Sequence, residues 1–514
     1  MKGGRYMHAV FVNTFYAHNL SGASFAVDRR LQLFLHHKIE TTVISADYYL
    51  TNRYYFHYHF PESSQHFLDL HDILTGNLER DEVDAWLRFY EGNSASYSFD
   101  TNKKIATAEN GVYFRWHNYD DDRLMSVHHY SKSNKLLRSD EYDWRGYLAV
   151  RAYYASNPND GQNYVVSREH LNPDGQTVLT YHFTSDSQIR RIDWQDKTGQ
   201  VQYFNQKNDL LFAALKYYIM SIDDEVLMVL DLFHSDTISK LQSLNTLANM
   251  CLVVQLHNIQ VKNTPENSPT RIGYSYPVLN SEKYSGLIVL TERQRQDVLA
   301  LADPDRIFTI AENWYDEHDV TTHDAIKWSD KEDGLVIISA RYDKTKQIDH
   351  AIKAVITAHK RTPNIHLEIW GGGNDNVRKE LQEIIDKHQA NEYIKLMGIT
   401  DNQHMKHRIA NAQLHVLVSK NEGLPMVFFE AQLGKTPSIS YDIDYGPDEI
   451  ITNRVNGDLI AANDITYLSS RMIELFQNPG TLEHYSENSN QTLIKFREEA
   501  IWQKWENLIK QVFG

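Results

Sequence analysis

The chain opens with short apolar runs that alternate with a helical stretch. Residues 7–13 fit a buried strand, residues 23–37 fit a helix and residues 41–45 fit a second strand. A loop that holds Ser21 and Gly22 lies between the first strand and the helix. This order of strand, loop and helix is typical of the first βαβ unit of an α/β domain.

A different rhythm follows. Aromatic-rich runs such as 112–117 and 148–154 alternate with period two, and turn formers such as Asn172-Pro-Asp-Gly separate them. This pattern is typical of an antiparallel meander. We therefore predict an inserted β-meander domain that splits the first α/β domain. The predicted boundaries are 1–51 and 207–318 for the first domain and 52–206 for the insertion.

The α/β rhythm then resumes and continues beyond an acidic linker at 316–333. Predicted strands lie at 225–230, 251–256, 286–290 and 307–311 before the linker, and at 335–339, 366–370, 394–396, 415–418 and 438–441 after it. A long amphipathic helix at 482–512 closes the chain. We predict a second Rossmann-like domain at 319–485 and a C-terminal helix, 486–514, that crosses back to the first domain. Two doubly wound domains that face each other across a cleft make an α/β fold of the GT-B architecture.

Composition and charge narrow the possible partners. The 52 Lys and Arg against 68 Asp and Glu give a net charge of -16, which argues against unspecific binding of nucleic acid or anionic membranes. The single cysteine, Cys251, excludes an internal disulfide and fits a reducing compartment. No apolar run approaches the ~20 residues of a membrane span, and the first residues lack the apolar core of a signal peptide. We expect a cytoplasmic protein, and peripheral association with the inner face of the membrane stays open.

Two cations follow the first strand of the second α/β domain. Arg341 and Lys346 lie at the carboxyl end of that strand, where open α/β sheets bind their ligands. A planar guanidinium and a mobile ammonium together suit a diphosphate. The alternative is a pair of solvated loop cations.

Two carboxylates flank the start of a later helix. Pro425 suits the first turn of that helix, and the N–H groups of Met426 and Val427 would point toward a bound anion. Glu422 precedes the helix and Glu430 lies two turns inside it, so the two could reach opposite ends of one ligand, the sugar and the ribose. The alternative is a capping residue and a surface residue, although the apolar surroundings of Glu430 require a partner.

A glycine run and two Asp-x-Asp pairs are further candidates for ligand or metal binding. Gly371 to Gly373 open a turn after a buried strand, which fits either a nucleotide contact or a plain strand-to-helix turn. Asp303-Pro-Asp305 and Asp442-Ile-Asp444 lie in turns, whose chemistry explains them. The 25 histidines lack metal-ligand spacing. Since Arg341 and Lys346 supply the countercharge, we predict no metal and no cofactor.

These residues, in this order, resemble glycosyltransferase family 4, the retaining GT-B family with a paired Arg and Lys and a Glu-x7-Glu motif. The resemblance covers the two α/β segments and rests on Arg341 with Lys346, Gly371 to Gly373, and Glu422 with Glu430. The inserted meander further resembles the wall-teichoic-acid α-glycosyltransferases, which include poly(glycerol-phosphate) α-glucosyltransferases. The O-GlcNAc transferases of serine-rich adhesins share this layout.

The resemblance implies a role for each matched residue. Arg341 and Lys346 would hold the donor diphosphate, Glu422 the sugar hydroxyls and Glu430 the ribose. His257 matches the active-site histidine near the sugar and the acceptor, and a hydrogen-bonded core histidine is the alternative. The other residues expected to bind the donor are Gly22, Gly371, Gly423, Leu424, Met426 and Val427.

The implied reaction transfers glucose or N-acetylglucosamine, with retention, from a UDP-sugar to hydroxyls of a polyanionic wall teichoic acid, a poly(glycerol- or ribitol-phosphate). Two alternatives stay open: an O-GlcNAc transferase for a serine-rich adhesin, and a non-catalytic glycan-binding paralogue. We also predict a homo-oligomer, by resemblance a trimer, held through residues 52–206. The alternative is a monomeric acceptor platform. No nucleic-acid partner is expected.

Overall fold

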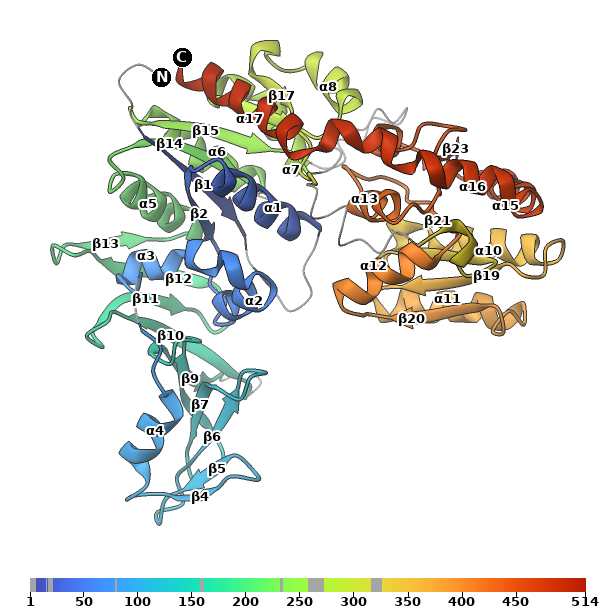
Figure 1. Ribbon diagram of the computed structural model, residues 1–514. Helices are drawn as coiled ribbons and strands as arrows, with labels where there is room; N and C mark the ends of the chain where they lie inside the picture. Colours follow the sequence, from blue (N-terminus) through green and yellow to red (C-terminus); the bar gives the residue numbers. More distant parts are fainter. Residues whose placement is uncertain are drawn as a thin grey trace. The chain divides into compact units, whose positions relative to one another are not determined.

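The computed structural model describes residues 6–14, 16, 22–78, 81–157, 161–231, 234–257, 272–315 and 326–514. The chain forms two compact units, Met1–Leu252 and Val253–Gly514 (Figure 1). Three sheets organise the described residues: a seven-stranded sheet, a ten-stranded sheet and a six-stranded sheet. Of the described helices, none is long and apolar enough to cross a membrane.

The seven-stranded sheet has the strand order β17-β16-β15-β14-β1-β2-β3. Its strands are β1 Met7–Asn13, β2 Glu40–Ser45, β3 Phe67–Asp69, β14 Glu225–Leu230, β15 Met250–Gln255, β16 Gly286–Val289 and β17 Ile307–Thr309. The neighbouring helices in the chain are α1 Gly22–His36, α2 Asn52–His59, α3 Leu70–Thr75, α5 Lys207–Ile219, α6 Ser235–Leu241, α7 Ile272–Leu279 and α8 Glu292–Leu299. β1 pairs in parallel with both β14 and β2, and its central residues are fully buried. The strands predicted from continuous apolar runs are therefore confirmed, because strands buried on both faces carry such runs.

The ten-stranded sheet is antiparallel, and its strands follow one another in chain order. They are β4 Ser98–Asp100, β5 Ile105–Thr107, β6 Tyr113–Asn118, β7 Leu124–Tyr130, β8 Leu136–Tyr142, β9 Leu148–Ser156, β10 Asn163–Leu171, β11 Thr177–Phe183, β12 Ile189–Gln195 and β13 Val201–Phe204. At one hairpin the Asn172 carboxamide accepts hydrogen bonds from the N–H groups of Asp174 and Gln176, and Gly175 adopts a φ of +77°. Side-chain acceptors and left-handed glycines fix these turns, so the predicted meander is confirmed.

The meander begins later than residue 52, the predicted boundary. β3 pairs in parallel with β2, so the segment from α2 to α3 contributes to the first parallel sheet. The first antiparallel strand is β4, which starts at Ser98 after helix α4 Ala85–Asn93. A strand of three residues is too short to produce a recognisable apolar run, which explains the difference.

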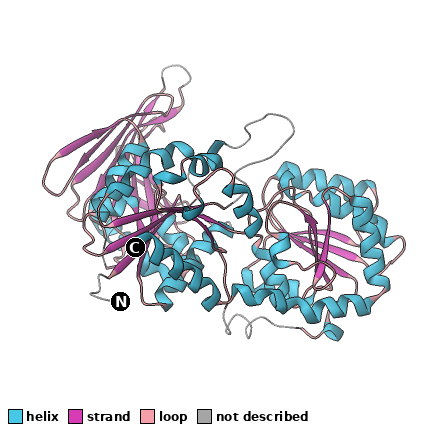
Figure 2. Cartoon of the chain, turned by 90° about the horizontal axis from the view of Figure 1, so that it is seen from above, coloured by secondary structure: helices cyan, strands magenta, loops and turns pink. Residues whose placement is uncertain are grey.

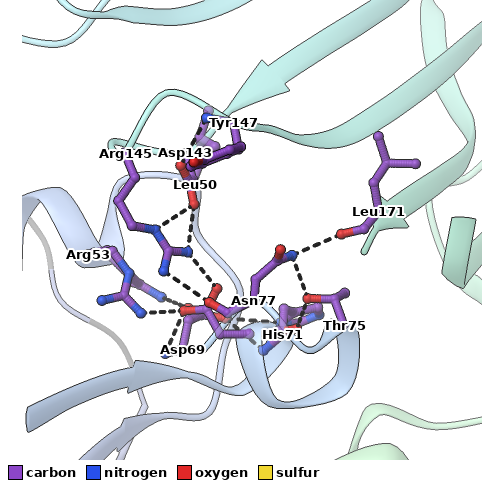
Figure 3. A network of polar contacts seen from close by, with 12 residues as sticks. Leu50, Arg53, Asp69, His71, Thr75, Asn77, Asp143, Arg145, Tyr147 and Leu171 are labelled. Atoms are coloured by element: carbon purple, nitrogen blue, oxygen red, sulfur yellow. Dashed lines mark hydrogen bonds and ion pairs between the residues drawn. The ribbon is translucent and has the colours of Figure 1, made fainter. Parts of the chain in front are cut away.

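A buried polar network ties the meander to α3 (Figure 3). The Arg145 guanidinium, in the turn after β8, donates to Asp143 at 2.6 Å, to Asp72 at 3.1 Å and to the Asn77 carbonyl at 2.9 Å. Arg53 adds a second ion pair to Asp72 at 2.5 Å. Burial acts to raise the pKa of Asp72, but Arg53 and Arg145 outweigh it and hold that pKa below its usual value. The network therefore anchors the inserted sheet through charges that depend on one another.

The six-stranded sheet is parallel, with the order β20-β19-β18-β21-β22-β23. Its strands are β18 Leu335–Ser339, β19 His366–Trp370, β20 Ile394–Gly398, β21 Leu414–Leu417, β22 Ser438–Asp442 and β23 Gly457–Ala461. Its helices are α10 Ile348–His359, α11 Asp375–Lys387, α12 Asn402–Asn411, α13 Met426–Leu433, α14 Pro447–Ile450 and α15 Ile465–Gln477. Figure 2 shows helices on both faces of this sheet. Apolar residues of β18, α10 and α15 form one core, so this sheet has the Rossmann-like layering that the sequence predicts.

The end of the chain is broken, where the sequence predicts one long helix. α16 Pro479–Asn488 is followed by a 3₁₀ segment, Ser489–Phe496, and then by α17 Glu498–Phe513. Arg497 is extended there because the backbone of Tyr315 bonds to residues on both sides of it, at 3.1 Å to Phe496 and 3.1 Å to Glu498. α17 lies against β17, and its Gln511 side chain donates to the Asp305 carbonyl.

Candidate functional site

Two loops meet at the carboxyl end of the six-stranded sheet. One follows β18 and holds Arg341 and Lys346, and the other follows β21 and holds Glu422. The N–H of Lys420 donates to the carbonyl of Thr345 at 2.7 Å, which joins the two loops. Since ligands of open parallel sheets bind at this edge, the predicted residues lie where a nucleotide would be held.

Lys346 and Glu422 form a direct ion pair. The Lys346 Nζ lies 2.6 Å from the Glu422 Oε1, and the two side chains are only 18% and 12% exposed. Lys346 ends a short 3₁₀ turn, Lys344–Lys346, that Asp343 caps by accepting from the Thr345 N–H at 2.7 Å. Hydrogen bonds from Thr345 hold the pKa of Asp343 below its usual value. The capped turn thus positions the Lys346 ammonium. Its partner, the Glu422 carboxylate, has two oxygens and can accept further hydrogen bonds from a ligand.

Arg341 is exposed, and its side chain makes no hydrogen bond or ion pair with the residues that the structure describes. Its loop packs against the predicted glycine run. A Cβ on Gly371, which has a φ of +146°, would lie 2.1 Å from the Ala340 carbonyl oxygen. The N–H of Tyr342 donates to the Gly372 carbonyl at 2.7 Å. The close approach of the Ala340 backbone is therefore enough to require glycine at position 371. A contact between Gly371 and the nucleotide remains a prediction.

Gly423 allows the Glu422 loop to approach His257. A Cβ on Gly423 would lie 2.3 Å from the His257 carbonyl oxygen. The His257 Nδ1 lies 2.7 Å from the Glu312 Oε2, and these side chains are 5% and 7% exposed. A carboxylate that orients a histidine fits the active-site role, and it equally satisfies a buried core histidine. Glu312 was not predicted, although its place directly after the predicted strand 307–311 is a usable signal.

Helix α13 presents an uncapped N-terminus. Pro425 is its N-cap residue, one position earlier than predicted, and no side chain in the described part of the chain caps the helix. The first N–H groups of a helix have no intrahelical partner, so those of Met426 and Val427 remain for an anion. Leu424, before the proline, is buried at 3% exposure.

Glu430 lies in the second turn of α13. Burial raises the pKa of its carboxyl, and the charge of Lys406 opposes this only in part. No side-chain hydrogen bond joins Glu430 to another described residue, so the partner that its burial requires does not come from this part of the chain. A ligand hydroxyl would supply that partner.

Gly22 is the first residue of α1 and is exposed. It belongs to the unit Met1–Leu252, whereas the other predicted site residues belong to Val253–Gly514. Its neighbour Ser21 lies outside the described residues. The role of Gly22 at the donor phosphates therefore stays a prediction.

The Asp-x-Asp pairs have structural partners. Asp303 caps a 3₁₀ turn by accepting from the Asp305 N–H at 3.1 Å. Arg293 lies 3.1 Å from Asp442 and 2.5 Å from Asp444. Within the described residues, no three or more His, Cys, Asp or Glu side chains are grouped as metal ligands would be. The predicted turn role holds for Asp303 and Asp305, whereas Asp442 ends strand β22 and is paired, like Asp444, with Arg293, which the sequence did not predict.

Residues 319–492 match the family model of Glycosyl transferases group 1. A poly(ribitol-phosphate) alpha-N-acetylglucosaminyltransferase of Staphylococcus aureus is 30% identical over 45% of each chain. The GtfA subunit of a UDP-N-acetylglucosamine–peptide N-acetylglucosaminyltransferase of Streptococcus pneumoniae is 25% identical over 79% of this chain and 80% of its own. A poly(glycerol-phosphate) alpha-glucosyltransferase of Bacillus subtilis is 24% identical over 76% of this chain and 57% of its own.

Solved structures show the same fold along the whole chain. The pneumococcal O-GlcNAc transferase GtfA, in complex with UDP and GlcNAc, superposes with a TM-score of 0.82 at 21% identity, over 99% of both chains. TarM superposes with a TM-score of 0.70 at 19% identity, over 98% of both chains. The predicted GT-B fold class with an inserted antiparallel sheet is confirmed. The family match and these relatives also support the predicted enzyme class, a glycosyltransferase that uses a UDP-sugar.

Proposed function

We propose that the chain transfers glucose or N-acetylglucosamine from a UDP-sugar to hydroxyls of a poly(glycerol- or ribitol-phosphate), with retention of anomeric configuration. The observation that carries this proposal is the Lys346–Glu422 pair, 2.6 Å apart, beside the exposed Arg341. Cations for a diphosphate and a carboxylate for sugar hydroxyls meet at the ligand-binding edge of a parallel sheet.

The donor occupies this edge with its diphosphate between Arg341, Lys346 and the N–H groups at the start of α13. The guanidinium supplies a planar fork and the helix N-terminus adds fixed positive charge. Lys346 moves one hydrogen bond from Glu422 to the phosphate, which leaves Glu422 to accept from the sugar hydroxyls. Glu430, whose carboxylate has no hydrogen-bond partner among the described residues, accepts from the ribose.

The reaction is a front-face displacement at the anomeric carbon. The bond from that carbon to the diphosphate oxygen breaks, and a bond to the acceptor oxygen forms on the same face. The acceptor proton passes to the departing diphosphate, so no protein nucleophile is needed. The chain contributes by stabilising the negative charge that develops on the diphosphate. Arg341 and Lys346 supply this countercharge without a metal ion.

Two classes of acceptor are compatible with this donor site. The relatives act on poly(ribitol-phosphate), poly(glycerol-phosphate) and peptide, as their names state. O-glycosylation of a serine-rich adhesin is therefore the second candidate, with the same donor site. A paralogue without turnover is disfavoured because the Lys346–Glu422 pair and Arg341 are all retained. Both enzyme reactions place the protein in the cytoplasm, where UDP-sugars are made.

An acceptor panel tests the function. The purified chain is incubated with UDP-glucose or UDP-N-acetylglucosamine and with poly(glycerol-phosphate), poly(ribitol-phosphate) or a serine-rich peptide, and released UDP is measured. The proposal expects one donor and a polyol-phosphate polymer to stimulate UDP release well above hydrolysis. Stimulation by the serine-rich peptide alone supports the second candidate. No stimulation by any acceptor, with either donor, contradicts both.

A homo-oligomer held by the meander, a trimer by resemblance, also belongs to this proposal. β13 is an edge strand of the antiparallel sheet, and its Val201 and Tyr203 side chains are 42% and 65% exposed. Exposed apolar edges are a common route to self-association. Tyr203→Lys should therefore lower the mass seen by light scattering, whereas Tyr58→Lys on α2, at a site 60% exposed, should not. A monomeric wild-type chain would refute the oligomer.

A further inference from the structure

The inserted sheet contains a large open pocket of its own. The pocket has a volume of about 690 Å³, within the range of small-molecule sites. It lies between the start of α4 and the turns that follow β6 and β8. Its lining residues all belong to the unit Met1–Leu252, whereas Arg341, Lys346 and Glu422 belong to the unit Val253–Gly514.

Three indole rings line this pocket. Trp86 of α4 and Trp116 of β6 have ring centroids 4.8 Å apart, and Trp144 comes from the turn after β8. Trp86 is half-buried, and Trp116 is only 5% exposed. Within the described residues, neither the Trp86 nor the Trp116 indole N–H has a hydrogen-bond partner. Neither indole nitrogen is among the buried side-chain atoms that lack a partner, so both N–H groups are accessible and can donate to a ligand in the pocket.

The polar wall is already held in place. The Trp144 indole N–H donates to Asp121 at 2.9 Å, and Arg123 stacks 4.2 Å from the centre of the Trp144 ring. Arg123 also pairs with Glu82 at 2.9 Å and with Asp121 at 3.3 Å. The carboxylates and the guanidinium keep further acceptor and donor sites beyond these contacts. A wall ordered in advance lowers the entropic cost of binding.

The charge of the lining selects the ligand class. Its ionisable residues are Glu82, Asp84, Asp121, Asp122, Lys104 and Arg123, four carboxylates against two cations. Phosphate-rich ligands are repelled by such a surplus of negative charge. An uncharged ligand is needed that offers apolar C–H surface to indoles and hydroxyls to carboxylates. A pyranose ring has both features.

We propose that this pocket binds an uncharged pyranose residue of a glycan, as a saccharide site additional to the donor site. The proposal does not depend on the proposed transferase function, because the pocket is complete within the inserted sheet and α4. The same lining disfavours a polyol-phosphate chain, because its surplus of carboxylates repels phosphate groups.

The test uses fluorine NMR of the full chain labelled with 5-fluorotryptophan. The chain contains nine tryptophans, so nine signals are expected. Trp86→Phe, Trp116→Phe and Trp144→Phe variants assign the three pocket signals. Glucose and N-acetylglucosamine, added up to about 10 mM, should shift the signals of Trp86, Trp116 and Trp144 saturably. Glycerol 3-phosphate should leave them unchanged.

Two variants report on the lining itself. Trp86→Ala and Asp121→Asn should each weaken sugar binding about tenfold. Asp174→Asn, the same charge change in an exposed turn of the same sheet, should leave it unchanged. The proposal is overturned if the sugars shift none of the three pocket signals, if glycerol 3-phosphate shifts them equally, or if neither lining variant weakens binding. UDP release measured on the same samples reports on the transferase function independently.

Discussion

Replacing Lys346 by methionine separates the structural and the catalytic contributions of the Lys346–Glu422 pair. The pair is 2.6 Å apart, with side chains 18% and 12% exposed. A hydrogen bond to a charged group contributes about 1.5–3 kcal/mol, and partial access to water reduces the loss to the lower end of that range. For a domain of this size, about 1.5 kcal/mol corresponds to a fall in Tm of roughly 3–6 °C.

The kinetic loss should be larger. Removing one donor to developing negative charge costs about 10²–10³ in turnover, or roughly 2.7–4 kcal/mol. Arg341→Ala should cause a similar kinetic loss with an unchanged Tm, because the side chain makes no hydrogen bond or ion pair with the described residues. The double variant Lys346→Met/Glu422→Gln removes both charges and leaves neither unpaired. Its Tm should therefore be close to that of the wild type, whereas its turnover should stay as low as that of Lys346→Met.

The measurements are UDP release at saturating donor and thermal unfolding by scanning calorimetry. Lys344→Met is the matched control, because that lysine lies in the same turn but is 74% exposed and, among the described residues, pairs only with Glu380 at 3.1 Å. It should keep both turnover and Tm. If Lys346→Met retains more than about a tenth of the wild-type turnover, the diphosphate role is refuted. A fall in Tm for Arg341→Ala would refute the description of its loop.

Three further predictions concern the ligand and the anchor of the meander. Glu422→Gln should lower turnover more than it lowers UDP affinity, whereas Glu430→Gln should weaken UDP binding itself; calorimetric titrations with the opposite order would refute the two assignments. Turnover should survive excess EDTA, and a loss that Mn²⁺ or Mg²⁺ restores would refute the metal-free mechanism. Arg145→Met should destabilise the unit Met1–Leu252 by about 3 kcal/mol at neutral pH, the lower end of the range for a broken buried ion pair, since it leaves Asp143 without its guanidinium while Asp72 keeps Arg53. The folded-state pKa of Asp72 is lowered, so its contribution is present above about pH 4 and is lost as the pH falls through that lowered pKa. The difference from wild type should therefore shrink in acid, and a pH-independent difference in Tm would refute the ion-pair explanation.

Most of the parallel strands could be predicted from the sequence, because a strand that is buried on both faces consists of a continuous run of apolar residues. β1, β14 and β18 lie where such runs predict them. β3 was not predicted, since three residues carry too little pattern, and its pairing with β2 moved the start of the meander. The break at Arg497 depends on bonds to Tyr315, far away in the chain.

In the site, too, the sequence predicted which residues take part but not which of them contact one another. The residue types and their order predicted Arg341, Lys346, Glu422 and Glu430 as one group, because the ends of parallel strands meet at one edge. The direct contact of Lys346 with Glu422 joins residues 76 positions apart, and no local pattern specifies it. The pairing of His257 with Glu312 likewise depends on how the loops pack.

The most direct test of the account is the anomeric configuration of the product. The chain is incubated with UDP-glucose or UDP-N-acetylglucosamine and a short glycerol- or ribitol-phosphate acceptor, and proton NMR follows the new anomeric signal together with UDP. The account predicts an α-linked sugar that appears in step with UDP, and neither signal in the Lys346→Met variant. A β-linked product, or α-linked transfer that Lys346→Met leaves unchanged, would contradict it.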